Sequence, residues 1–122
     1  MTLRVLAVDD SLTMREMLRA ALSAAGFDVT LAEDGLDALD RLAEAAPDLI
    51  VTDLNMPRMD GFGFIEAVRA GDTAARVPIL ILTTETGAKL KDRARAIGAT
   101  GWITKPFDEG SLVATINRVA AV

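Results

Sequence analysis

Short runs of apolar residues alternate along the chain with segments in which apolar residues recur at helical spacing. The runs predict five β-strands, over residues 3–8, 28–32, 48–53, 78–83 and 101–104. Three of these runs are almost continuously apolar, which is typical of strands buried on both faces of a parallel sheet. The pattern therefore indicates a sheet that is covered by helices on both sides.

The segments that follow the runs carry apolar stripes at the spacing of amphipathic helices. Glycine or proline ends the first four stripes, at Gly26, Pro47, Gly71 and Gly98. Alternating β and α units of this length predict parallel strands joined by right-handed crossovers, and hence one α/β domain with five helices over residues 1–122. The stripe residues are Met14, Leu18, Ala21, Leu22 and Ala25; Leu39, Leu42 and Ala43; Phe64, Ile65 and Val68; Leu90, Ala94 and Ile97; and Leu112, Val113, Ile116 and Val119.

The composition is typical of a folded protein with one hydrophobic core. The chain has 122 residues, of which 51% are hydrophobic and 25% are charged. Its net charge of −5 argues against a broad nucleic-acid interface, which requires a basic face. The N-terminus lacks the features of a signal peptide, and no segment has the length of a membrane span. We therefore expect neither nucleic acid nor a membrane as a partner.

Two residue types are missing, and each absence excludes a class of chemistry. Without cysteine the chain forms no disulfide, thiolate or zinc–thiolate site, which suits a reducing cytoplasm. Without histidine it has no imidazole base or metal ligand, and no Ser-His-Asp or Cys-His mechanism. Chemistry in this protein must therefore depend on carboxylates, hydroxyls and lysine, and we expect a cytoplasmic location.

Residues suited to such chemistry stand where the predicted strands end. Ligands of open α/β sheets bind beyond the carboxyl ends of the strands, so residues at those ends are expected to converge. The second strand would contribute from further away if it lies at an edge of the sheet. The residues in strand order are Asp9 and Asp10, Glu33 and Asp34, Asp53, Thr83 and Thr84, and Lys105.

Each of these residues also has a purely structural interpretation. Asp10 or Ser11 could cap the first helix, and Lys105 could be a solvated loop residue. Residues 55–57, Asn-Met-Pro, could serve only to make a turn. However, the candidates stand at the functional ends of different strands, where chance would scatter them, and this favours a shared site.

The chemistry of the candidates favours a metal ion and phosphoryl transfer. Three clustered carboxylates repel one another, and ligation by oxygen alone suits a hard cation such as Mg²⁺. A bound cation would leave Asp53 able to approach an electron-rich phosphoryl group, and aspartyl phosphates are a known form of covalent intermediate. Lys105 and a threonine hydroxyl would then hold the phosphoryl oxygens.

Four separated motifs resemble the receiver domain of two-component response regulators. They are VDDS at 8–11, DLNMPRMDG at 53–61, LTTE at 82–85 and KPF at 105–107, and the resemblance runs in order along essentially the whole chain. Within that family, DDSLTMR, Asn55 and LTTE are most similar to the single-domain chemotaxis regulators. The resemblance implies a flavodoxin-like, doubly wound sheet of five parallel strands in the order 2-1-3-4-5.

The resemblance also implies a role for each site residue. Asp53 would be the phospho-acceptor. Mg²⁺ would be bound by the side chains of Asp10 and Asp53, by Asp9 directly or through water, and by the backbone carbonyl of Asn55. The phospho-acceptor role would also explain why a buried strand ends in a carboxylate, because Asp53 would stand there to be phosphorylated.

Three further roles follow from the same resemblance. Thr83 would bond the phosphoryl group and Lys105 would pair with it. Trp102 stands at the position of the aromatic switch residue, and its alternative interpretation is a half-buried surface aromatic. Phosphorylation would then remodel the surface formed by the fourth helix, the fifth strand and the fifth helix.

The implied function is a phosphorylation-activated signalling switch and not an enzyme. A sensor histidine kinase of the CheA type would donate the phosphoryl group, the output partner would be a flagellar motor switch protein, and a phosphatase would be an optional partner. A phosphate sink and the receiver portion of a longer regulator stay open, although the end of the chain just after the fifth helix favours a stand-alone regulator. A haloacid dehalogenase-type phosphatase is a remote alternative, because residues 9–11 replace its D-x-D motif and no cap insertion is present.

Overall fold

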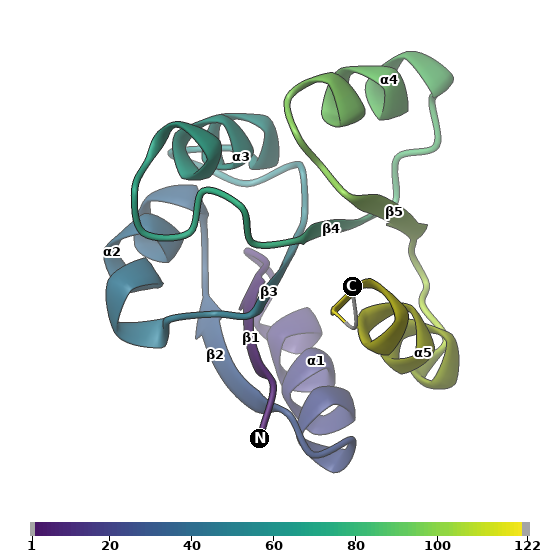
Figure 1. Cartoon of the computed structure of the whole chain (residues 1–122). Helices are drawn as coiled ribbons and strands as arrows, with labels where there is room; N and C mark the ends of the chain where they lie inside the picture. The colour runs from purple at the N-terminus through teal and green to yellow at the C-terminus, as the bar shows by residue number, and fades with distance from the viewer. Residues whose placement is uncertain (1, 121–122) are drawn as a thin grey trace.

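Five parallel strands form one sheet in the order β2-β1-β3-β4-β5, which confirms the expected topology (Figure 1). The structure, a computed structural model, describes residues 2–120. The strands are β1 Arg4–Val8, β2 Asp28–Ala32, β3 Leu49–Thr52, β4 Ile79–Thr83 and β5 Gly101–Thr104. The helices are α1 Leu12–Ala24, α2 Gly35–Ala45, α3 Gly61–Ala70, α4 Ala88–Ala96 and α5 Glu109–Ala120. The predicted strands at 3–8 and 78–83 begin one residue before β1 and β4, and the predicted strand at 48–53 extends one residue beyond β3 at each end.

Helices cover both faces of the sheet, α1 and α5 on one face and α2, α3 and α4 on the other (Figure 1). Because side chains alternate along a strand, β1 supplies both layers. Its Val5 and Ala7 pack with α1 and α5, whereas Leu6 and Val8 pack on the opposite side. This two-sided burial explains why the central strands are apolar without interruption.

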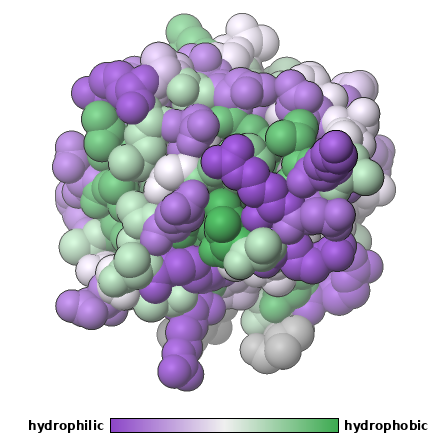
Figure 2. Space-filling model, turned by 90° about the horizontal axis from the view of Figure 1, so that it is seen from above, coloured by the Kyte–Doolittle hydropathy of each residue, from purple (hydrophilic) through white to green (hydrophobic). Residues whose placement is uncertain are grey.

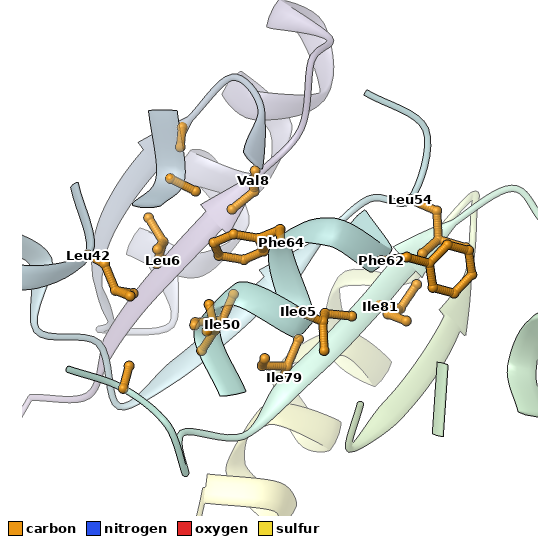
Figure 3. Packing of buried hydrophobic residues seen from close by; sticks show 14 of the residues in the cluster. Leu6, Val8, Leu42, Ile50, Leu54, Phe62, Phe64, Ile65, Ile79 and Ile81 are labelled. Carbon is orange, nitrogen blue, oxygen red and sulfur yellow. The ribbon is translucent and has the colours of Figure 1, made fainter. Parts of the chain in front are cut away.

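Helix α3 contributes the largest buried side chain of the core. Phe64 and its neighbour Ile65 are fully buried and lie over the sheet beside Leu6, Ile50 and Ile79 (Figure 3). Burial of each such side chain is worth roughly 1.5–3 kcal/mol. This packing fixes α3 against the strands, and with α3 it fixes the loop that runs from β3 into the helix.

Strand pairing continues just past the strand ends and aligns the candidate residues. The Asp53 N–H donates to the Val8 carbonyl at 3.0 Å, so Asp53 follows directly beside the end of β1. On the other side, the Lys105 N–H donates to the Thr83 carbonyl at 2.8 Å. Strand β2 lies at the edge of the sheet, as expected. The residues that follow it, Glu33 and Asp34, are therefore separated from the end of β3 by β1.

Polar residues at the helix starts have distinct local roles. Ser11 is the N-cap of α1, and its side chain accepts a hydrogen bond from the Met14 N–H. Asp10 makes no such bond, which decides between the two capping candidates.

At the other end of the helix, Gly26 has a φ of +90°, a left-handed conformation that favours glycine. Its position confirms the predicted end of the first helix.

The surface is predominantly polar where it is viewed from the α3 and α4 side. Hydrophilic side chains cover most of that face, and hydrophobic ones appear between them in small groups (Figure 2). Among the described residues, the exposed large hydrophobic side chains are Leu12, Met17 and Leu36. No helix within residues 2–120 is both long and apolar enough to span a membrane.

Candidate active site

Three carboxylates meet at the carboxyl end of the sheet. Asp9, Asp10 and Asp53 each offer one oxygen, and these oxygens lie within 4.8 Å of one another. Asp9 and Asp53 are buried, with exposed fractions of 2% and 8%, whereas Asp10 is exposed. The cluster is therefore open to solvent on the Asp10 side and enclosed on the side of the strands.

Lys105 binds the two buried carboxylates together. Its ammonium lies 2.7 Å from Oδ2 of Asp9 and 3.1 Å from Oδ2 of Asp53, and its side chain is only 11% exposed. Burial by itself lowers the pKa of Lys105, but the hydrogen bonds and charges of Asp9 and Asp53 outweigh it and raise the pKa above its usual value. The pKa of Asp9 is raised because burial exceeds the opposing effect of Lys105. The lysine thus stays charged beside two carboxylates.

Backbone donors fix the remaining oxygen of each buried carboxylate. Oδ1 of Asp9 accepts from the Ser11 N–H at 2.9 Å, and Oδ1 of Asp53 accepts from the Leu54 N–H at 2.7 Å. The guanidinium of Arg15 holds the Asp9 carbonyl at 2.8 Å. Each buried carboxylate is therefore oriented by one amide and one ammonium, and both Oδ2 atoms point toward Lys105.

Glu85 connects three residues that the sequence pointed to separately. Its N–H donates to Oγ1 of the fully buried Thr83 at 3.4 Å, and its Oε1 accepts from Nδ2 of Asn55 at 3.2 Å. Its carbonyl accepts from Nε1 of Trp102 at 3.1 Å. This role could not be predicted from the sequence, because a glutamate in a loop is usually a solvated side chain.

Trp102 lies away from the carboxylates, on the outer strand β5. The residue is half-buried, its ring packs against the hydrophobic layer of α2, α3 and α4, and the Lys91 ammonium lies 5.9 Å from the ring centroid. The indole N–H needs a partner when it leaves water, and the Glu85 carbonyl supplies it. Glu85 therefore links Trp102 to the Thr83 hydroxyl through two hydrogen bonds.

The loop between Asp53 and Gly61 closes tightly on itself. The Gly61 N–H donates to the Leu54 carbonyl at 2.8 Å. A Cβ atom at position 61 would lie 2.3 Å from the Asp53 carbonyl oxygen, so only glycine fits. The closing glycine of the DLNMPRMDG motif is therefore required by the approach of α3 to the end of β3.

A family model described as the response regulator receiver domain matches residues 5–117. The chain belongs to this family. Receiver domains take a phosphoryl group from histidine kinases and act as signalling switches, and this receiver is CheY-like in sequence and structure.

Known relatives cover nearly all of this receiver. A probable chemotaxis protein CheY of Rhizobium etli is 37% identical over 118 residues, which are 96% of this chain and 92% of that protein. The solved structure of the Vibrio cholerae chemotaxis protein CheY4 is 45% identical, with a TM-score of 0.93 over 98% of this chain and 99% of that chain. The receiver domain of a Pseudomonas aeruginosa sensor histidine kinase, solved with magnesium coordinated in its active-site cleft, is 26% identical, with a TM-score of 0.91 and 100% of both chains covered.

The acidic cluster of this receiver fits a magnesium ion. Receiver domains bind Mg²⁺ in the acidic cleft, and here three carboxylate oxygens converge with no nitrogen or sulfur ligand among them. Mg²⁺ keeps several waters and takes few carboxylates, so an exposed Asp10 beside two buried partners suits its coordination. The site therefore has both the donor atoms and the open side that a hydrated cation requires.

The structure brings most of the candidates that the sequence singled out to the carboxyl end of the sheet, in two groups. Asp9, Asp10, Asp53 and Lys105 form one cluster of charges. The second group comprises Asn55, Thr83 and Trp102, which are joined through Glu85. Glu33 and Asp34 stay outside both groups, as the edge position of β2 requires.

Proposed function

We propose that this receiver is a phosphorylation-activated response regulator in which Asp53 accepts a phosphoryl group from a sensor histidine kinase. The observation that carries the proposal is the position of the Asp53 carboxylate. It follows a buried strand, faces two further carboxylates and lies 3.1 Å from the Lys105 ammonium. We also propose that residues 1–122 form one receiver domain.

In the proposed transfer, an Asp53 oxygen attacks the phosphorus of the donor phosphohistidine. The new P–O bond makes an acyl phosphate, the P–N bond breaks, and the imidazole nitrogen leaves with the electron pair and takes up a proton from solvent. Asp9, Asp10, Asp53 and the Asn55 carbonyl would hold Mg²⁺, which neutralises charge on the phosphoryl oxygens when it is bound.

Two residues of this chain would then hold the transferred group. Lys105 is already charged and aimed at Oδ2 of Asp53, so a small shift carries its ammonium to a phosphoryl oxygen. Thr83 accepts from the Glu85 N–H, which leaves its own hydroxyl hydrogen to donate. Movement of Thr83 would alter Glu85 and, through its carbonyl, Trp102 at the surface of α4, β5 and α5.

We further propose that this receiver acts in chemotaxis. The support for this role is the similarity to the two chemotaxis proteins described above. The donor would be a kinase of the CheA type, the output partner a flagellar motor switch protein, and a phosphatase an optional third partner. A cytoplasmic location suits the cysteine-free sequence. A phosphate sink and the receiver portion of a longer regulator are the alternatives within the family.

A pull-down from cells of the source organism tests the output. Wild type treated with Mg²⁺ and beryllofluoride, a phosphoryl mimic, is compared with untreated protein and with treated Asp53→Asn. We expect a motor switch component to be enriched only by treated wild type. A phosphate sink would enrich the kinase alone, and equal capture by all three samples would contradict a phosphorylation-controlled output.

A further inference from the structure

An ion pair outside the carboxylate cluster joins the β3–α3 loop to the start of α2. Nε and Nη2 of Arg58 lie 2.8 Å and 3.0 Å from the two carboxylate oxygens of Asp34. The Asp34 side chain is only 3% exposed, and it also caps α2 by accepting from the Asp37 N–H at 2.9 Å. The pairing lowers the pKa of Asp34, first through the hydrogen bonds from Arg58. The carboxylate is therefore fixed, and it offers a rigid anchor for the guanidinium.

The backbone of Arg58 has a conformation that an arginine adopts only under constraint. Its φ is +65°, in the left-handed region that glycine and asparagine enter more easily. The next residue supports the same geometry, because the Met59 carbonyl accepts from the Gly35 N–H at 3.1 Å. A Cβ at Gly35 would lie 2.6 Å from the Met59 side chain, so helix and loop are in close contact.

The loop is held at four places, one of which is the Gly35–Met59 hydrogen bond given above. At its base, Gly61 bonds to Leu54. On one side, the Asn55 amide bonds to Glu85. On the other side, the Arg58–Asp34 pair supplies the only charged attachment that the described residues show between this loop and a neighbouring element. Loss of that pair would leave the Gly35–Met59 hydrogen bond to hold this part of the loop against α2, and would therefore loosen it.

We propose that Arg58 is a positioning residue for the metal site, which holds residues 55–59 so that the Asn55 carbonyl faces the carboxylate cluster. This inference rests on the proposed function, because it takes the Asn55 carbonyl as a Mg²⁺ ligand. Mg²⁺ demands near-ideal octahedral geometry, so a carbonyl on a loose loop binds it less well. Residues that orient metal ligands typically contribute at least tenfold to affinity.

Two substitutions remove the pair and preserve the local structure. Arg58→Asn keeps a residue that tolerates positive φ and removes the guanidinium. Asp34→Asn keeps an oxygen for the helix cap and removes the negative charge. Arg41→Gln is the matched control, because it breaks another Arg–Asp pair of α2, in which Nε of Arg41 lies 2.9 Å from Oδ1 of Asp37.

The experiment is a calorimetric titration of each folded protein with MgCl₂ and no phosphoryl donor. We expect affinity to fall by roughly tenfold in Arg58→Asn and in Asp34→Asn, and to stay at the wild-type value in Arg41→Gln. Backbone hydrogen exchange in the metal-free proteins is measured beside it. Exchange of the Met59 and Gly61 amides should be accelerated more in the two test variants than that of the buried Ile50 amide, which reports global stability.

Each result separates this inference from the function on which it rests. Wild type that fails to bind Mg²⁺ would contradict the proposed function itself. Wild type that binds, together with test variants of unchanged affinity, would overturn the positioning role alone. An equal loss of Mg²⁺ affinity in Arg41→Gln would also overturn the positioning role, because the loss would then come from a general weakening of α2.

Discussion

The Lys105 ammonium lies 3.1 Å from Oδ2 of Asp53, although 51 residues separate the two positions in the chain. The same ammonium binds Asp9, so one buried cation offsets two buried anions. Removing one partner of such a group costs about 3–5 kcal/mol, because a charge is left buried without compensation. Lys105 therefore stabilises the metal-free domain by binding both carboxylates, in addition to its proposed role in holding a phosphoryl group.

The first prediction concerns Lys105 and alkaline pH. Since the folded-state pKa of Lys105 is raised above 10.5, its contribution is fully present below pH 10.5 and is lost as pH rises through the folded value. Lys105→Met should thus be less stable than wild type by about 3 kcal/mol at pH 7, and the difference should shrink above pH 10.5. Chemical denaturation of metal-free protein across this range measures it. If the difference in free energy of unfolding between wild type and Lys105→Met stays constant as pH rises above 10.5, the ion pairs of Lys105 are not its cause.

The second prediction concerns the phospho-acceptor. Acetyl phosphate with Mg²⁺ should add one phosphoryl group to wild type, and Asp53→Asn should abolish the addition because an amide is a poor nucleophile. Intact-protein mass spectrometry detects the added group. Labelling that persists in Asp53→Asn, on another residue, would falsify the assignment of the acceptor.

The third prediction concerns Asp10, the exposed member of the carboxylate cluster. Asp10→Ala should bind Mg²⁺ at least tenfold more weakly, since the cation has few protein ligands to lose. The metal-free variant should be no less stable than wild type, because a repelling charge is removed from beside Asp9 and Asp53. Calorimetry and thermal unfolding check the two halves. Mg²⁺ binding at wild-type strength would exclude Asp10 as a ligand.

The fourth prediction uses the single tryptophan as a reporter. Beryllofluoride should draw Thr83 toward the mimic, disturb its bond with Glu85 and make Trp102 less accessible to acrylamide. Thr83→Ala should still be phosphorylated but should lose much of this response, since the hydroxyl connects the two sites. A coupling of about 1–3 kcal/mol between phosphoryl site and surface would be typical.

A quenching titration on both proteins, with and without the mimic, provides the measurement. Equal quenching of Trp102 in wild type with and without beryllofluoride would show that this aromatic does not report the switch. Phosphorylation of Asp53 could still occur in that case, so the acceptor and the switch are tested independently.

The fifth prediction concerns Asp34 and acidic pH. Because its folded-state pKa is lowered below 3.8, chiefly by Arg58, the stabilising effect of the pair is present above pH 3.8 and is lost as pH falls through the folded value. Arg58→Asn should therefore be less stable than wild type at neutral pH, and the two should converge in acid. Urea denaturation at a series of pH values checks this, and parallel curves down to pH 2 would contradict it.

The pattern of apolar residues was enough to predict the strands and helices of this fold, with the strand boundaries correct to within one residue. Periodicity is set by neighbours in the chain, so residues such as Leu6, Ile50 and Phe64 reveal the buried strands and helices directly. Because parallel strands end at one edge, Asp9, Asp53 and Lys105 could be placed together without coordinates. The strand order came from the likeness to receiver domains and was then confirmed.

Which side chains bind one another could be seen only in the folded structure. Local patterning did not predict that Lys105 contacts both buried carboxylates, that Glu85 connects Thr83 to Trp102, or that Arg58 reaches Asp34. Each of these contacts depends on how loops from different strands cross above the sheet, and loop conformation is fixed by packing rather than by periodicity. Bonds between distant residues appear only once the strands and helices have brought those loops together.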